Sequence, residues 1–109
     1  MISYFVRYRG AAEDPAEFNA YYESRHAALL RDFPHIRALV LHRPAAWHDP
    51  FPVRGDDTFL LAQMQFDSAA DLDAALRSDA RRAAREDFRH PPPFRGDVTH
   101  AAMAAKLVF

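Results

Sequence analysis

The sequence predicts an α+β fold of the ferredoxin-like kind, with a four-stranded antiparallel sheet and its helices on one face. Segments with strand and helix patterns follow one another in the order strand, helix, strand, strand, helix, strand. That order is the split βαβ arrangement. A chain of 109 residues has the length of one domain, so we expect residues 1–109 to form a single domain.

Four segments are expected to form strands, and the first of them is rich in aromatic and β-branched residues. They are residues 2–9, which end at Gly10, residues 36–43, residues 58–66 and a final segment, residues 98–109. The final segment is ambiguous between helix and strand, because Ala-Met-Ala-Ala has helical propensity, but its position in the chain favours a strand. Residues 44–57 contain three prolines and no periodicity, and they predict a long loop.

Two regions carry the signals of helix starts. Asp14 is placed to cap the first helix, and Pro15 suits its first turn. Pro34 should end this helix, because a proline disfavours helix in the residue before it. Ser68 is placed to cap the second helix, and a further short helix is expected from Asp79.

The predicted sheet has more apolar surface than its own helices can cover. Residues 36–43 and 58–66 are largely apolar on both faces, and Gln63 and Gln65 are exceptions. A sheet with one face in water should alternate between apolar and polar residues. Two helices cover one face only, so we expect a second copy to bury the other. The expected assembly is a homodimer.

Composition excludes several classes of protein. There is no cysteine, which excludes disulfides and thiolate zinc sites and favours a cytoplasmic location. The formal net charge of −1 argues against a nucleic-acid partner. Arginines are dense in residues 77–95, but acids lie among them or close by, so we interpret this stretch as a solvated helix face; the acids are Asp79, Glu86, Asp87 and Asp97. No apolar run reaches membrane-spanning length, so no membrane partner is expected.

No cofactor is predicted. The histidines lack HxH, HxxxH and HExxH spacings, which argues against a metal site. The chain has three glycines and no glycine-rich phosphate loop, and it has no GxSxG motif.

Tyr22 and His26 are the candidate catalytic residues. They lie one helical turn apart, on the stripe that also carries Phe18, and therefore share a face directed at the sheet. A histidine there is either a satisfied core residue or a pocket residue. In a pocket, a neutral imidazole can transfer a proton near pH 7, and the tyrosine hydroxyl can orient a substrate carbonyl or hold the histidine tautomer.

Further residues are candidates for substrate binding, each with an alternative. Phe18 would form an apolar wall. Arg7 either binds a carboxylate or phenolate or extends to solvent at the sheet edge. Gln63 interrupts an apolar strand and needs a partner if it is buried. His42 ends a strand next to the loop that holds Trp47, and that loop either covers the cavity or clamps onto the dimer partner.

A motif on the first helix resembles that of the EthD family. Phe18, Tyr21, Tyr22, His26, Ala27 and Leu29 follow the spacing F-x-x-Y-[W/Y]-x-x-x-H-A-x-L. The order of elements and the proline-rich loop are also similar. Two positions depart from the family pattern, which often has tryptophan where Tyr22 stands and proline where Ala28 stands. Tyrosine at the first position is similar to the methylmuconolactone isomerase branch, in which a Tyr/His pair lies in the pocket.

The resemblance implies a dimeric barrel that binds a small aromatic or lactone-like molecule. Relatives include ether-degradation proteins without a settled catalytic role, lactone isomerases, and oxygenases of aromatic polyketides that use neither metal nor flavin. We therefore expect a cofactor-independent isomerase or oxygenase, with Tyr22 and His26 in its pocket. The alternatives are a non-catalytic binding or accessory protein of a degradation pathway, a filled core without a cavity, and a haem-binding barrel.

Overall fold

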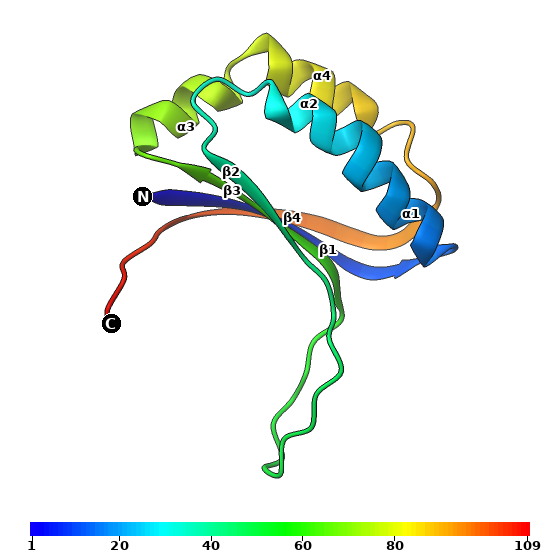
Figure 1. Cartoon of the computed structure of the whole chain (residues 1–109). Coiled ribbons are helices and arrows are strands. Elements are labelled where there is room, and N and C mark those ends of the chain that lie inside the picture. Colours follow the sequence, from blue (N-terminus) through cyan, green and yellow to red (C-terminus); the bar gives the residue numbers. More distant parts are fainter.

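The computed structural model describes residues 1–109 as two layers, a sheet and a helical layer on one of its faces (Figure 1). The elements in chain order are β1 (Ile2–Ala12), α1 (Pro15–Tyr21), the π-helical turn η1 (Tyr22–His26), α2 (Ala27–Arg31), β2 (Ala38–His42), β3 (Thr58–Phe66), α3 (Ala69–Leu76), α4 (Asp79–Asp87) and β4 (Phe94–Ala104). The strand order is β2-β3-β1-β4, and every neighbouring pair is antiparallel. The predicted ferredoxin-like fold is confirmed.

The first strand runs past Gly10, so the prediction that it ends there is wrong. Gly10 pairs with Gly96 of β4, and both residues have positive φ angles of 129° and 145°. A Cβ on Gly10 would lie 2.1 Å from the carbonyl oxygen of Arg95. The glycine here allows close approach of two strands, and it does not break the strand.

The first helical region begins as predicted and contains an irregularity that the sequence pattern did not indicate. The Asp14 carboxylate accepts a hydrogen bond from the Glu17 backbone N–H at 3.1 Å, and Pro15 starts the helix. The backbone then widens into the π-helical turn η1 before α2 continues to Arg31. The apolar stripe is buried as expected, with Phe18, Tyr22, His26, Leu30 and Phe33 facing the sheet.

The remaining elements follow the predicted order with shifted ends. β3 has the expected bounds, and β2 is shorter than expected. Ser68 and Ser78 cap α3 and α4 through hydrogen bonds from backbone N–H groups. The last segment is a strand, as its position favoured, but it begins at Phe94 and ends at Ala104. Residues 105–109 follow it without regular structure.

The core lies between the sheet and the helices. The largest fully buried side chains are Phe18, Phe66 and Leu60. Phe18 packs against the rings of Tyr8, Phe59 and Phe94, with centroids 5.4–5.6 Å apart. The other face of the sheet, which we call the open face, has no helix over it (Figure 1).

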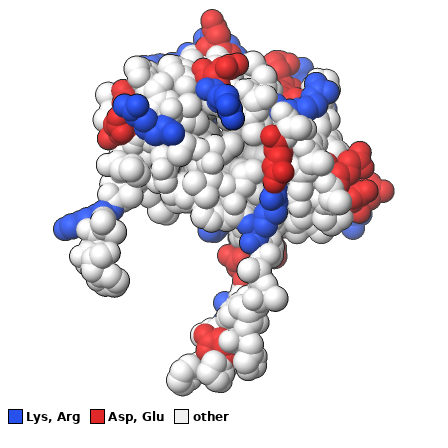
Figure 2. Space-filling model, viewed as in Figure 1, with Lys and Arg blue, Asp and Glu red and all other residues white.

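Two segments extend from the body of the molecule. Residues 43–57, which we call the arm, project away from the helical layer, and residues 105–109 form a tail (Figure 1). Both carry exposed apolar side chains, which are Trp47, Phe51, Val53, Leu107, Val108 and Phe109. Charged side chains of both signs are scattered over the helical layer, whereas the end of the tail is uncharged (Figure 2).

Candidate functional site

A buried histidine and a buried aspartate meet between η1 and the end of α4. Nδ1 of His26 lies 2.9 Å from Oδ2 of Asp87, and the Tyr21 hydroxyl donates to Oδ1 of Asp87 at 2.6 Å. His26 is 5% exposed and Asp87 is 8% exposed. Because an ionised carboxylate only accepts hydrogen bonds, Nδ1 carries a hydrogen, and in the neutral form of the imidazole Nε2 then has the lone pair of a base.

The electrostatics of this cluster keep Asp87 ionised. Burial acts to raise the pKa of Asp87, but the hydrogen bonds from Tyr21 and His26 outweigh it, and the pKa is lowered from its usual value. Burial, followed by the bond to Asp87, raises the pKa of Tyr21 to about 12. The cluster therefore consists of a carboxylate, a phenol that donates to it and an imidazole whose Nδ1 faces the carboxylate.

Tyr22 lies beside His26 and extends the cluster toward the sheet. The two ring centroids are 4.8 Å apart, and Tyr22 makes an edge contact with Tyr8 at 5.8 Å. Burial raises the pKa of Tyr22 above its ordinary value, so its hydroxyl stays protonated. Tyr22 and His26 are the first and last residues of η1. Single π-helical turns inside α-helices occur often at functional sites, because they redirect side chains.

A small cavity lies next to the two predicted catalytic residues. Its walls come from all layers of the fold, and its lining residues are Tyr4, Val6, Tyr22, His26, Leu30, Phe33, Met64, Arg81, Ala84, Arg85, Phe88 and His100. Its volume is about 20 Å³, which is room for roughly one water molecule. A ring-sized ligand therefore requires side chains at the mouth to move.

The predicted site residues fall into two groups on opposite faces of the sheet. Tyr22 and His26 line the cavity on the helical side, and Phe18 packs in the core nearby. Arg7, Gln63, His42 and Trp47 are elsewhere. They belong to the open face and the arm, and none of them lines the cavity. The structure therefore does not bring the seven candidates into one site.

The second group surrounds a hollow at the base of the arm. Arg7, His42 and Trp47 line this hollow, which has a volume of about 480 Å³. Nε2 of His42 lies 3.0 Å from Oε1 of Gln63, whose Nε2 donates to the Ser3 hydroxyl at 3.1 Å. Gln63 therefore finds its polar partners within the sheet. The arm points away from the helical layer, so it does not cover the His26 cavity of its own chain (Figure 1).

Sequence reasoning missed Asp87 and Tyr21. Asp87 was assigned to a solvated face, and that assignment is wrong, because its carboxylate is buried against His26. Asp87 lies in an arginine-rich stretch, which favoured the interpretation as a solvated face. The available signal was helical phase: Ala84 and Asp87 are the buried residues of α4, three positions apart on one face. Tyr21 was read only as a motif position.

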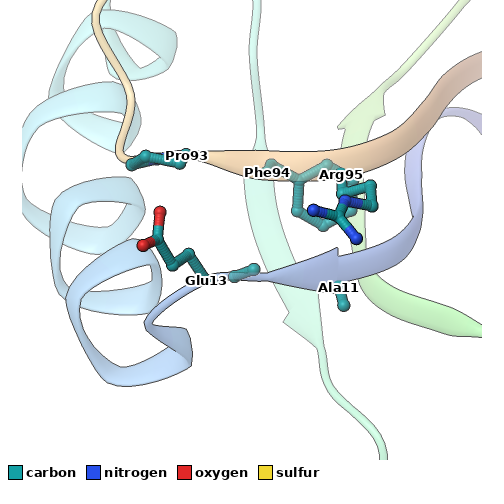
Figure 3. Close-up of a pocket in the computed structure, with 6 residues that line it drawn as sticks. Ala11, Glu13, Pro93, Phe94 and Arg95 are labelled. Carbon is teal, nitrogen blue, oxygen red and sulfur yellow. The ribbon is translucent and has the colours of Figure 1, made fainter.

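Another hollow, of about 520 Å³, lies where β1 ends and β4 begins (Figure 3). Glu13 extends toward Pro93 there, and the Glu13 backbone N–H donates to the Pro93 carbonyl at 3.1 Å. The hollow contains no histidine, so it lacks a group that titrates near neutral pH. No group of three metal-ligating side chains lies together in the chain, and no helix is long and apolar enough to cross a membrane.

Solved structures share this fold at low sequence identity. An EthD family protein from Bacillus halodurans is 21% identical, with 97% of this chain and 99% of that chain covered and a TM-score of 0.76. SnoaB, a cofactor-independent oxygenase from Streptomyces nogalater, is 18% identical, with 98% and 94% covered and a TM-score of 0.66. A monooxygenase from the ActVA-Orf6 gene of Streptomyces coelicolor, solved with nanaomycin D, is 16% identical, with 99% and 89% covered and a TM-score of 0.67.

The family is established from the sequence itself. No curated protein matches the chain. The EthD domain model, however, matches residues 11–90, which is more than half of the chain and includes the first helical motif, His26 and Asp87. The chain belongs to the EthD family.

Proposed function

We propose that this protein binds a small aromatic or lactone-like molecule beside His26 and removes a proton from it without a cofactor. The observation that carries the proposal is the buried hydrogen bond between His26 Nδ1 and the ionised Asp87. A carboxylate on Nδ1 fixes the tautomer and stabilises the imidazolium that forms when Nε2 accepts a proton. Isomerisation by a proton shift and cofactor-independent oxygenation of a phenol share this first step.

Tyr22 supplies the second polar group in this proposal. Its ring lies against His26, and its hydroxyl remains protonated because burial raises its pKa. A protonated phenol can donate a hydrogen bond to a substrate oxygen that becomes negative as the proton leaves. Tyr22 would therefore orient the substrate while His26 acts as the base. The structural likeness to SnoaB and the ActVA-Orf6 monooxygenase makes an oxygenase a natural subclass of this proposal.

The ligand must enter through the side of the cavity that lies at the surface. Arg85 and His100 are exposed there, and Phe88 is half-buried, whereas Tyr22 and His26 are covered. Rotation of exposed side chains occurs on the nanosecond scale and opens space without unfolding. The volume of about 20 Å³ is thus that of the proposed pocket when it is closed.

Deuterium exchange tests the proton-transfer step directly. α-Angelica lactone and 1-naphthol serve as probes, and NMR follows exchange into carbon positions in D₂O. His26→Ala should slow the protein-catalysed exchange by about a hundredfold or more, because a positioned base contributes on that order. Asp87→Asn should slow it less, and the control Asp79→Asn, at an exposed pair with Arg82, should leave it unchanged.

The outcomes separate the two main alternatives. Exchange that persists in His26→Ala would show that the imidazole is not the base. Binding of a probe without any exchange would instead identify a non-catalytic binding protein. A filled core would bind neither probe, and the midpoint of thermal unfolding would not shift with either compound.

We also propose that two copies associate through the open face. Apolar side chains on that face, such as Val40 and Met103, are exposed, and so are Trp47 and Phe51 on the arm. Exposed apolar surface of this kind marks an interface. Sedimentation should give a dimer at micromolar concentration, and Val40→Glu should shift it toward monomer, whereas Ala83→Glu on the exposed side of α4 should not. A folded wild-type monomer at that concentration would rule out the dimer.

A further inference from the structure

We propose that the substrate of the His26 cavity is a small organic anion, recognised at the mouth by Arg81 and Arg85 of α4. This inference rests on the proposed function and narrows its substrate class. Both arginines line the cavity together with His100 of β4. No acidic residue lines it, since Asp87 lies behind His26 with both oxygens engaged. The mouth therefore carries positive charge without a counter-ion.

The contrast within α4 shows that this arrangement differs from an ordinary charged helix. The solvent-facing Arg82 pairs with Asp79. Arg89, just after the helix, pairs with Glu86 at 3.6 Å. In each pair the acid lies three residues before the arginine. Neither cavity-lining arginine has an acid three or four residues away in either direction. The two lie four residues apart, so like charges face each other on one helix surface, which destabilises a helix.

The side chains of both arginines are held by neighbouring groups. Arg81 is half-buried, and its Nη1 donates a long bond to the Leu76 carbonyl at 3.4 Å. Arg85 lies over the ring of Phe88, with its guanidinium carbon 5.2 Å from the centroid. Phe88 in turn contacts His26, with ring centroids 5.3 Å apart. An anion held by the guanidinium groups would thus place its attached carbon skeleton next to the imidazole base.

The pKa of His100 reflects the positive charge of the two arginines. Burial, followed by the charges of Arg85 and Arg81, lowers the pKa of His100. The other groups that face it are Tyr4 of β1, with ring centroids 5.9 Å apart, and Tyr22 and His26 across the cavity. No carboxylate is among these groups. A guanidinium pair can bind a carboxylate with charge-assisted, bidentate hydrogen bonds, and the neutral imidazole can donate a further one.

Benzoate and its neutral isostere benzamide test the proposal by calorimetry. The proteins are the wild type, the double variant Arg81→Gln/Arg85→Gln, and the matched control Arg82→Gln/Arg89→Gln, which removes the same charge from the same helical region. Benzoate should bind the wild type and the control alike. Its affinity should fall about tenfold or more in the cavity variant, which is the effect of losing hydrogen bonds to a charged group. Benzamide should bind weakly to all three.

NMR titration of His100 gives a readout that does not depend on turnover. Benzoate should raise the pKa of His100 in the wild type, and removing the two guanidinium groups should raise it without any ligand. Arg85→Gln alone provides a second variant, since Arg85 is exposed and its loss should not disturb folding. Circular dichroism of each variant confirms the fold.

Three results would overturn the inference. They are equal affinity for benzoate and benzamide, equal benzoate affinity in the two double variants, and no benzoate binding by the wild type. If one of these three results is found and neutral probes still undergo His26-dependent exchange, the proposed proton transfer survives while the anionic substrate class is lost. If the cavity variant loses benzoate affinity while His26→Ala leaves exchange unchanged, the anion site stands and the proposed base is wrong.

Discussion

The two faces of the sheet use polar groups in different ways. On the helical face, His26, Asp87 and Tyr21 form a cluster in which the imidazole and the carboxylate are almost fully covered. On the open face, His42 and Gln63 also form a hydrogen bond, but His42 is exposed and its partner is a neutral amide. A covered charge must be compensated within the protein, whereas an exposed imidazole can be hydrated.

This difference between the two faces indicates which of them is suited to act on a ligand. In the covered cluster the carboxylate fixes the state of the imidazole, and a cavity adjoins it. On the open face, apolar side chains alternate with Arg7, Gln63 and Thr99, which is the composition of an association surface more than of a catalytic pocket. The first face is therefore proposed to act on a ligand, and the second to bind another copy.

The largest expected difference between the faces concerns packing. Phe18→Ala should lower the free energy of unfolding by about 3–5 kcal/mol, because this ring is 1% exposed and leaves a cavity in the core. Phe5→Ala on the half-buried open face should cost less than about 2 kcal/mol in the monomer. Denaturant unfolding at several protein concentrations measures both. Equal costs at low concentration would contradict the distinction between the faces.

Removal of the buried carboxylate should have the next largest effect. Asp87→Asn keeps the shape of the side chain but replaces the ionised acceptor of two hydrogen bonds, so we expect a loss of about 1.5–3 kcal/mol at pH 7. Asp79→Asn, at an exposed pair with Arg82, should change stability by no more than about 0.5 kcal/mol. Similar losses in the two variants would mean that the His26–Asp87 bond is no stronger than a surface pair.

The pH dependence of that loss sharpens the same comparison. The pKa of Asp87 is lowered in the folded protein, so its contribution is fully present above its unfolded value, about 3.9, and disappears as pH falls through the lower folded value. The stability advantage of the wild type over Asp87→Asn should therefore shrink as the pH falls from about 5 to below about 4. Urea unfolding across this range provides the measurement. An advantage that grew over this range would have the wrong sign.

The sequence predicted the architecture better than the site, for a physical reason. Helix caps at Asp14 and Ser68 and the bounds of β3 depend on local chemistry, which short windows of sequence contain. The Asp87–His26 bond joins residues 61 positions apart. No periodicity encodes such a distance.

The candidate site was predicted in part for the same reason. Tyr22 and His26 were found because one helical face carries both. Arg7 and Gln63 were grouped with them because each strand position could face either side of the sheet until the pairing of β1 with β3 was known. Gly10 was misread as a strand end, since its role depends on Gly96, far along the chain.

The smallest expected effect is at the open-face imidazole. His42→Ala removes one hydrogen bond to Gln63 at an exposed position, so the monomer should lose about 0.5–1 kcal/mol or less. If two copies close over this face, the same change should weaken the dimer and make the loss depend on protein concentration. Sedimentation equilibrium of the wild type and His42→Ala separates the two contributions. Because His42 lies next to Trp47 in the hollow at the base of the arm, a dimer constant that does not change would place the partner's contact away from the arm, and the open face would then associate through β4 and its exposed Met103.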